Sequence, residues 1–209
     1  DGGMSSSDVG ATFQANIPNS YGDFQVGVYN GEGYSAAEPN NQKAFMARGS
    51  VRPFPMGGAL AKSVRVTAFY FGDHYLKAYQ RKRVVGNVSI ERPKYNFSFD
   101  YLTRVDQSKT PPDTTKIESG GYSVVLTPFF KEKGNGFEAL LRYDSFRPDS
   151  GNFSDRRQNR TIAGLAYWFP HPGGAGTAAL LLDYEGLRYK NFPGQARQNK
   201  ITLHGLINF

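Results

Sequence analysis

Charged and polar side chains recur at every second position in several segments of the chain. Glu138, Arg142 and Asp144 share one side of one segment, and Asp100 and Arg104 share one side of another. Side chains two residues apart on a β-strand point to the same face. These faces gather carboxylates and guanidinium groups, and rings of such groups attract and sort ions in pores. The pattern therefore favours ion binding over covalent chemistry.

Catalytic groups are sparse. The histidines are His74, His171 and His204, and their spacing matches no metal-ligand pattern. The chain has no cysteine, no nucleophile elbow and no glycine-rich phosphate loop. Asp73 beside His74 is an isolated pair of neighbours, which is more often structural than catalytic. We expect no enzyme, no metal and no cofactor, and the basic residues form no nucleic-acid recognition motif.

Long helical patterns are absent, and extended segments position the charged residues. Each segment alternates apolar with polar residues over about 8 to 12 positions, and turn-rich stretches separate them. About eleven such segments cover approximately 9–17, 23–30, 43–53, 63–71, 82–91, 95–105, 119–130, 137–146, 160–169, 178–188 and 200–209.

Alternation of this kind suits either a soluble β-sandwich or a transmembrane β-barrel. Strand length favours the barrel, because membrane strands need about 9 to 11 residues and globular strands average about 5 to 6. No run approaches the roughly 18 apolar residues of a spanning helix. Aromatic residues make up 14% of the chain, which also fits a barrel with aromatic girdles. We predict an all-β, transmembrane antiparallel β-barrel in a single domain over 1–209.

The connectors are expected to alternate between long and short. Residues 189–199, 147–159, 107–117, 72–81 and 31–42 form the long set, and bacterial barrels place long loops outside the cell and short turns in the periplasm. Phe209 is then periplasmic. Eleven strands put residue 9 at the extracellular end, whereas single-chain bacterial barrels have even strand numbers. We therefore expect N-terminal strands to be missing, as in part of a 16-stranded barrel.

In such a barrel the apolar face meets lipid and the polar face lines the lumen. Arg48, Arg52 and Arg65 are expected to form a ladder that attracts anions. Arg104 and Arg142 are expected to pair with carboxylates across strands, although all these groups could simply hydrate the wall. The candidate pore-lining residues are Arg48, Arg52, Arg65, Asp100, Arg104, Glu138, Arg142, Asp144, Asp183, Glu185 and His204.

Two further sets of residues are assigned to the barrel rims. The net charge is +7, and basic groups at 81–83 and 156–160 are expected in outer loops that could bind lipopolysaccharide. Aromatic residues near strand ends are expected in girdles at both membrane interfaces. The girdle residues are Tyr21, Tyr70, Tyr95, Tyr143, Tyr167, Trp168 and Phe169.

Four stretches carry a family resemblance. Residues 23–34, with Asn30-Gly31 at a strand end, and residues 43–53, ending in Arg52-Pro53, are similar to the phosphate-selective porin O/P family. Residues 164–170 and 182–185 are similar to that family's final strands. The resemblance implies a trimeric, water-filled diffusion channel, sometimes anion-selective. The basic constriction of the phosphate-selective members cannot be matched residue by residue.

The final segment resembles the C-terminal signal that outer-membrane assembly machinery reads. Tyr184, Leu203, Ile207 and Phe209 are assigned to this signal. The resemblances lead us to expect a Gram-negative outer-membrane porin for small, possibly anionic, solutes such as phosphate. Its expected partners are outer-membrane lipids, lipopolysaccharide, the assembly machinery and two further copies of the chain. The alternative is an accessory barrel that scaffolds a larger outer-membrane assembly.

Overall fold

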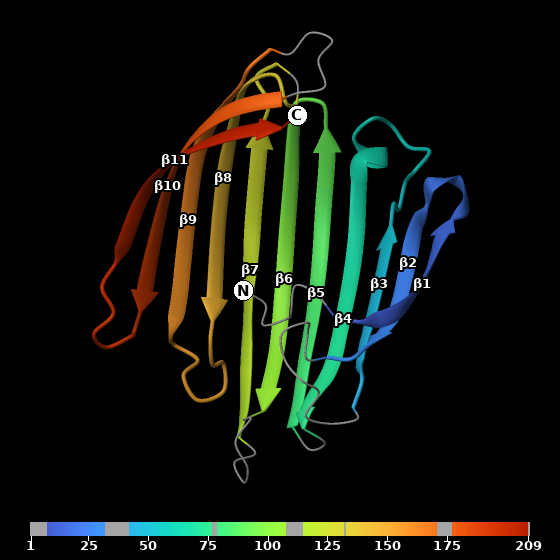
Figure 1. Ribbon diagram of the computed structural model, residues 1–209, viewed down its shortest axis with the longest axis vertical. Helices are drawn as coiled ribbons and strands as arrows, with labels where there is room; N and C mark the ends of the chain where they lie inside the picture. The colour runs from blue at the N-terminus through green and yellow to red at the C-terminus, as the bar shows by residue number, and fades with distance from the viewer. Residues whose placement is uncertain are drawn as a thin grey trace.

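The protein forms one antiparallel sheet in which every strand pairs with its neighbours in the sequence (Figure 1). The computed structural model describes residues 8–31, 42–76, 79–107, 115–131, 133–170 and 177–208. The strands are β1 (Gly10–Ile17), β2 (Gly22–Tyr29), β3 (Ala44–Val51), β4 (Val64–Leu76), β5 (Tyr79–Arg92), β6 (Tyr95–Gln107), β7 (Lys116–Pro128), β8 (Gly136–Arg147), β9 (Arg157–Trp168), β10 (Thr177–Lys190) and β11 (Gln198–Asn208). Two short 3₁₀ helices, η1 (Pro18–Ser20) and η2 (Ala61–Ser63), lie in connectors.

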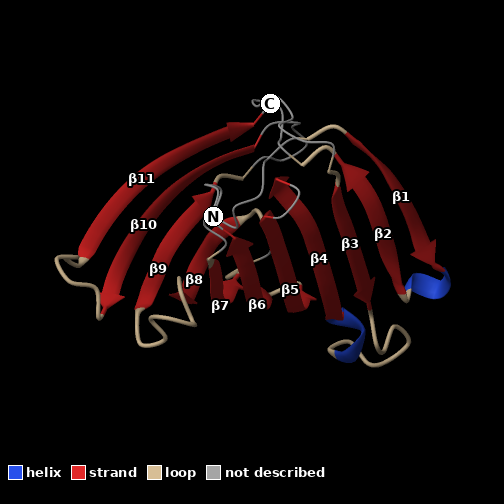
Figure 2. Ribbon diagram, turned by 90° about the horizontal axis from the view of Figure 1, so that it is seen from below, coloured by secondary structure: helices blue, strands red, loops and turns tan. Residues whose placement is uncertain are grey.

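The predicted all-β class and the eleven strands are confirmed, and the sheet is open. Its order runs from β1 to β11 without closing, so each edge strand has a neighbour on one side only. Figure 2 shows the sheet curved into an arch, with β1 and β11 on opposite sides. No helix in the described parts of the chain is long and apolar enough to cross a membrane.

The predicted long loop at 72–81 is wrong. β4 continues to Leu76 and β5 begins at Tyr79, so strand occupies most of this stretch. The period-two pattern continues through it, because Phe71 and Asp73 pair across the strands with Arg83 and Arg81. The β3–β4 connector at 52–63 is longer than this one, so the expected strict alternation of connector lengths fails at both places.

Several of the most buried side chains lie on β4 and β5, next to Gly31. Asp73 is 2% exposed and forms a buried ion pair with Arg81. The Arg81 guanidinium also donates to the Gly31 carbonyl and lies 5.6 Å from the centre of the Phe71 ring. Gly31 has φ +100, and an added Cβ would lie 2.7 Å from Oδ1 of Asp73. Glycine is required here for both its conformation and its close approach.

A buried ion pair is costly to break, because the remaining charge stays desolvated. Asp73→Ala is expected to lower the free energy of unfolding by about 3–5 kcal/mol, measured by urea titration with circular dichroism. Asp73→Leu combined with Arg81→Met should recover most of this loss. The exposed control Asp155→Ala should change it by less than about 0.5 kcal/mol. Equal losses for both alanine variants would contradict the role of the pair.

Candidate functional site on the concave face

The register of the sheet divides the side chains between two faces of opposite character. Residues paired across neighbouring strands point to the same side. One row of paired positions crosses from β1 to β9 with a polar side chain on every strand. This polar row consists of Asn16, Asp23, Ser50, Thr67, Asn87, Asp100, Ser123, Asp144 and Arg160.

The neighbouring positions point to the convex side and are mostly apolar. Many of them are large side chains that solvent reaches freely, although a water-soluble sheet would normally cover such a surface. The exposed convex residues include Phe13, Phe24, Val26, Val28, Phe45, Val66, Tyr70, Val84, Val88, Phe99, Tyr101, Tyr122, Leu141, Tyr143, Leu165, Leu180, Leu182, Ile201, Leu203 and Ile207.

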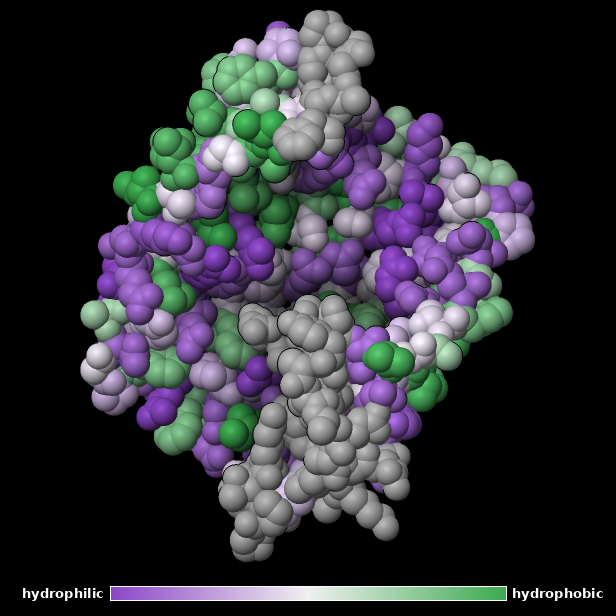
Figure 3. All heavy atoms as spheres, viewed as in Figure 1, coloured by the Kyte–Doolittle hydropathy of each residue, from purple (hydrophilic) through white to green (hydrophobic). Residues whose placement is uncertain are grey.

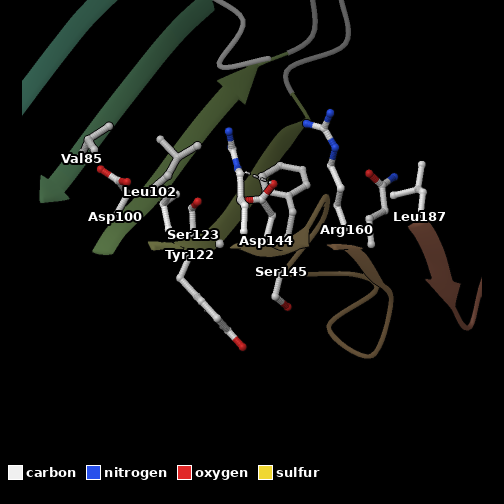
Figure 4. Close-up of a pocket in the computed structure, with 14 residues that line it drawn as sticks. Val85, Asp100, Leu102, Tyr122, Ser123, Asp144, Ser145, Arg160 and Leu187 are labelled. Atoms are coloured by element: carbon white, nitrogen blue, oxygen red, sulfur yellow. Dashed lines mark hydrogen bonds and ion pairs between the residues drawn. The ribbon is translucent and has the colours of Figure 1, made fainter. Parts of the chain in front are cut away.

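The polar row lies on the concave face. In the view of Figure 3, hydrophilic residues gather across the middle of a hollow. Figure 4 shows Asp144 and Arg160 standing on one side of the ribbon, with Tyr122 and Ser145 pointing to the other. The residues around Asp144 and Arg160 line an open pocket of about 560 Å³, and its apolar lining includes Val85, Leu102, Phe146 and Leu187.

Ion pairs connect the concave charges on β8 to β11. Arg142 donates through Nε to both carboxylate oxygens of Asp144, at 2.9 and 3.0 Å. Arg160 Nε lies 2.6 Å from Oε1 of Glu185. On the next pair of strands, Nε2 of His204 lies 2.8 Å from Asp183. The first of these contacts thus lies within β8, the second joins β9 to β10, and the third joins β10 to β11.

A second set of ion pairs lies on β2 to β4. Asp23 binds Arg48 through Oδ1 at 2.6 Å and Arg65 through Oδ2 at 3.0 Å. Arg48 also donates to Ser50, whose hydroxyl lies 2.7 Å from that of Thr67. The predicted ladder of Arg48, Arg52 and Arg65 is thus partly neutralised, because Asp23 holds two of its three members.

The expected cross-strand network of Arg104, Arg142, Asp100 and Asp144 does not form as predicted. Arg104 pairs with Asp106 and Arg142 with Asp144, each on its own strand. Asp100 accepts hydrogen bonds from Asn87 and Ser98 instead.

The register also shows on which face of the sheet the other predicted residues lie. Glu138 accepts a 3.0 Å hydrogen bond from Nε1 of Trp168, which places Trp168 on the concave face rather than in an outer girdle. Tyr184, Leu203 and Ile207 lie on the convex face, and Phe209 lies outside the described residues. The assignment of these four residues to an assembly signal stays a prediction.

Sequence reasoning missed several charged residues of this face. Arg81 and Arg83 were expected in an exposed loop, but both are buried, with Arg83 paired to Asp106 at 2.7 Å. Arg160, which was both grouped with the outer-loop basic residues and placed at the start of the predicted segment 160–169, lies within β9. Continuing the two-residue alternation from Val85 back to Arg81 would have found the first two.

No group of three or more His, Cys, Asp or Glu residues comes together in the described parts of the chain, so no candidate metal centre is found there.

Comparison with known proteins finds no relative: no family model, no curated protein and no solved structure matches the chain. The resemblance to the porin O/P family stays a prediction.

The half-exposed ion pairs of this face should contribute little to folding. The side chains of Arg160 and Glu185 are 40% and 30% exposed, so solvent screens their attraction. We expect a double-mutant cycle of Arg160→Gln and Glu185→Gln, measured by urea unfolding, to give a coupling of about 0.2–1 kcal/mol. A coupling as large as the loss in Asp73→Ala would show that these charges serve stability instead of solvating the face.

Proposed function

We propose that the chain is part of an outer-membrane β-barrel of the porin type, with a water-filled channel along the concave face. The observation that carries this proposal is the polar row on the inside of the arch, opposed by exposed apolar side chains on the outside. A curved soluble sheet buries its apolar side chains inside and exposes its polar ones. A transmembrane barrel reverses this, with an apolar outer band and a polar lumen.

Closure of the barrel is part of the proposal. Unpaired backbone groups at a sheet edge are too costly in hydrocarbon, so both β1 and β11 need hydrogen-bond partners. Eleven antiparallel strands leave β1 and β11 running in the same direction. An antiparallel closure therefore requires an odd number of additional strands between them, which agrees with the even counts of bacterial barrels.

Asn87 and Val88 test the proposed lipid contact with matched substitutions. They are adjacent on β5 and point to opposite faces, Asn87 within the polar row and Val88 toward the outside. In lipid vesicles, Val88→Arg should lower the free energy of unfolding by about 2–4 kcal/mol, because the charge enters hydrocarbon.

The control Asn87→Arg places the same charge on the concave face and should have a much smaller effect. The measurement is urea unfolding in vesicles, with heat-modifiable gel migration as a check of folding. Equal effects of the two variants would refute the lipid-facing assignment of the convex side.

Conductance tests the channel itself. The protein reconstituted in planar bilayers should carry a current, and Asp23→Asn should shift the reversal potential in a KCl gradient toward anion selectivity. The shift is expected because Asp23 pairs with both Arg48 and Arg65 and offsets one of their two positive charges. The loop variant Asp155→Asn removes the same charge elsewhere and should shift it less. A folded barrel without any current would favour the alternative function of an accessory scaffold.

A further inference from the structure

A second pocket lies at the end of the sheet where β3, β4 and β5 meet their turns. It has a volume of about 550 Å³. Its walls come from the β3–β4 connector, from η2, from the start of β4 and from the end of β5. It is separate from the pocket around Asp144 and Arg160, with which it shares no lining residue.

The lining of this pocket is strongly basic. Arg52, Lys62, Arg65 and Arg92 all line it, and Glu91 is the one carboxylate among its described lining residues. Arg52 and Lys62 come from the β3–β4 connector, Arg65 from β4 and Arg92 from β5, so the fold and not a continuous charge run brings them together. Four like charges in one pocket repel one another, and an anion between them relieves that repulsion.

Two of the cations are held by the protein and two are available. Arg65 binds Asp23, and Arg92 donates to the carbonyl of Ala59. Arg52 and Lys62 have no ion-pair partner among the residues that the structure describes. The two held cations fix the shape of the pocket, and the two available ones can bind a ligand.

The size of the pocket indicates the kind of anion. Four cations line a volume of about 550 Å³, which is several times the size of one small inorganic ion. Ligand pockets for small organic molecules begin at about 300 Å³. We infer that this pocket binds a small organic polyanion that carries two or more carboxylate or phosphoryl groups.

The inference deepens the proposed function, on which it rests for the role of the site. Arg65 and Glu91 point to the concave side, by their register with Ser89 and Asn96, whereas Arg92 pairs with Tyr95 and points to the other side. The pocket therefore lies across the rim of the sheet. A polyanion held here would lie at the mouth of the proposed channel. Such a site would concentrate the solute where it enters or leaves.

Calorimetric titration of the full chain in detergent micelles tests the inference, with citrate as the probe at constant ionic strength. Citrate should bind more tightly than inorganic phosphate, and acetate should bind least. Arg52→Gln and Lys62→Gln should each weaken citrate binding by about tenfold or more, since a charged hydrogen bond is lost. Lys94→Gln, at the same end but outside the pocket lining, should leave it within about twofold.

Glu91→Gln gives a test of opposite sign. Removal of the one repelling carboxylate should tighten citrate binding, a gain that a folding defect does not produce. Absence of citrate binding to the folded protein, or equal weakening by Lys94→Gln, would overturn the inference. If either result is found and the protein still carries a current in planar bilayers, the citrate site is wrong and the channel proposal is unaffected. Citrate binding without current would overturn the channel and keep the site.

Discussion

The two-residue period of the β-strand is the constraint on which the whole molecule depends. It sends alternate side chains to opposite faces, so one sequence pattern produces both the apolar convex surface and the polar row inside the arch. Neither face works as an ordinary protein core. The interior of the arch is rich in charge, and the largest apolar surface is on the outside. This distribution is the observation on which the proposal of an apolar surrounding rests.

The ion pairs on the concave face differ in burial, and we expect their contributions to stability to differ accordingly. The pair of Asp73 and Arg81 is buried and links two strands to the β2–β3 connector through Gly31. The pairs of Arg142 with Asp144 and of Arg160 with Glu185 are far more accessible. Burial therefore separates the one pair that is expected to stabilise the fold from the accessible pairs, which are expected to contribute little. All of these pairs lie on the concave side.

Much of the fold could be predicted from the sequence, because period-two alternation is a local signal. It located all eleven strands to within a few residues, except around 72–81, where Gly72 and Asp73 looked like turn residues. Asp73 lies within a strand and forms an ion pair with Arg81 on the partner strand. This pairing joins residues on two strands, so the residues around Asp73 alone do not reveal it. Charge partners were harder to predict for the same reason. Asp23 binds two arginines from two other strands, and only the register reveals that contact.

The register that joins Asp23, Asp100 and Asp144 in one row also bears on how accurately the sheet can assemble. A slip of one residue between two strands would move carboxylates and guanidinium groups to the convex side and apolar residues to the interior. A slip of two would keep the faces but separate partners such as Arg160 and Glu185. Each of these ion pairs therefore adds only a small preference for the correct alignment, but the preferences of several pairs across the sheet act in the same direction.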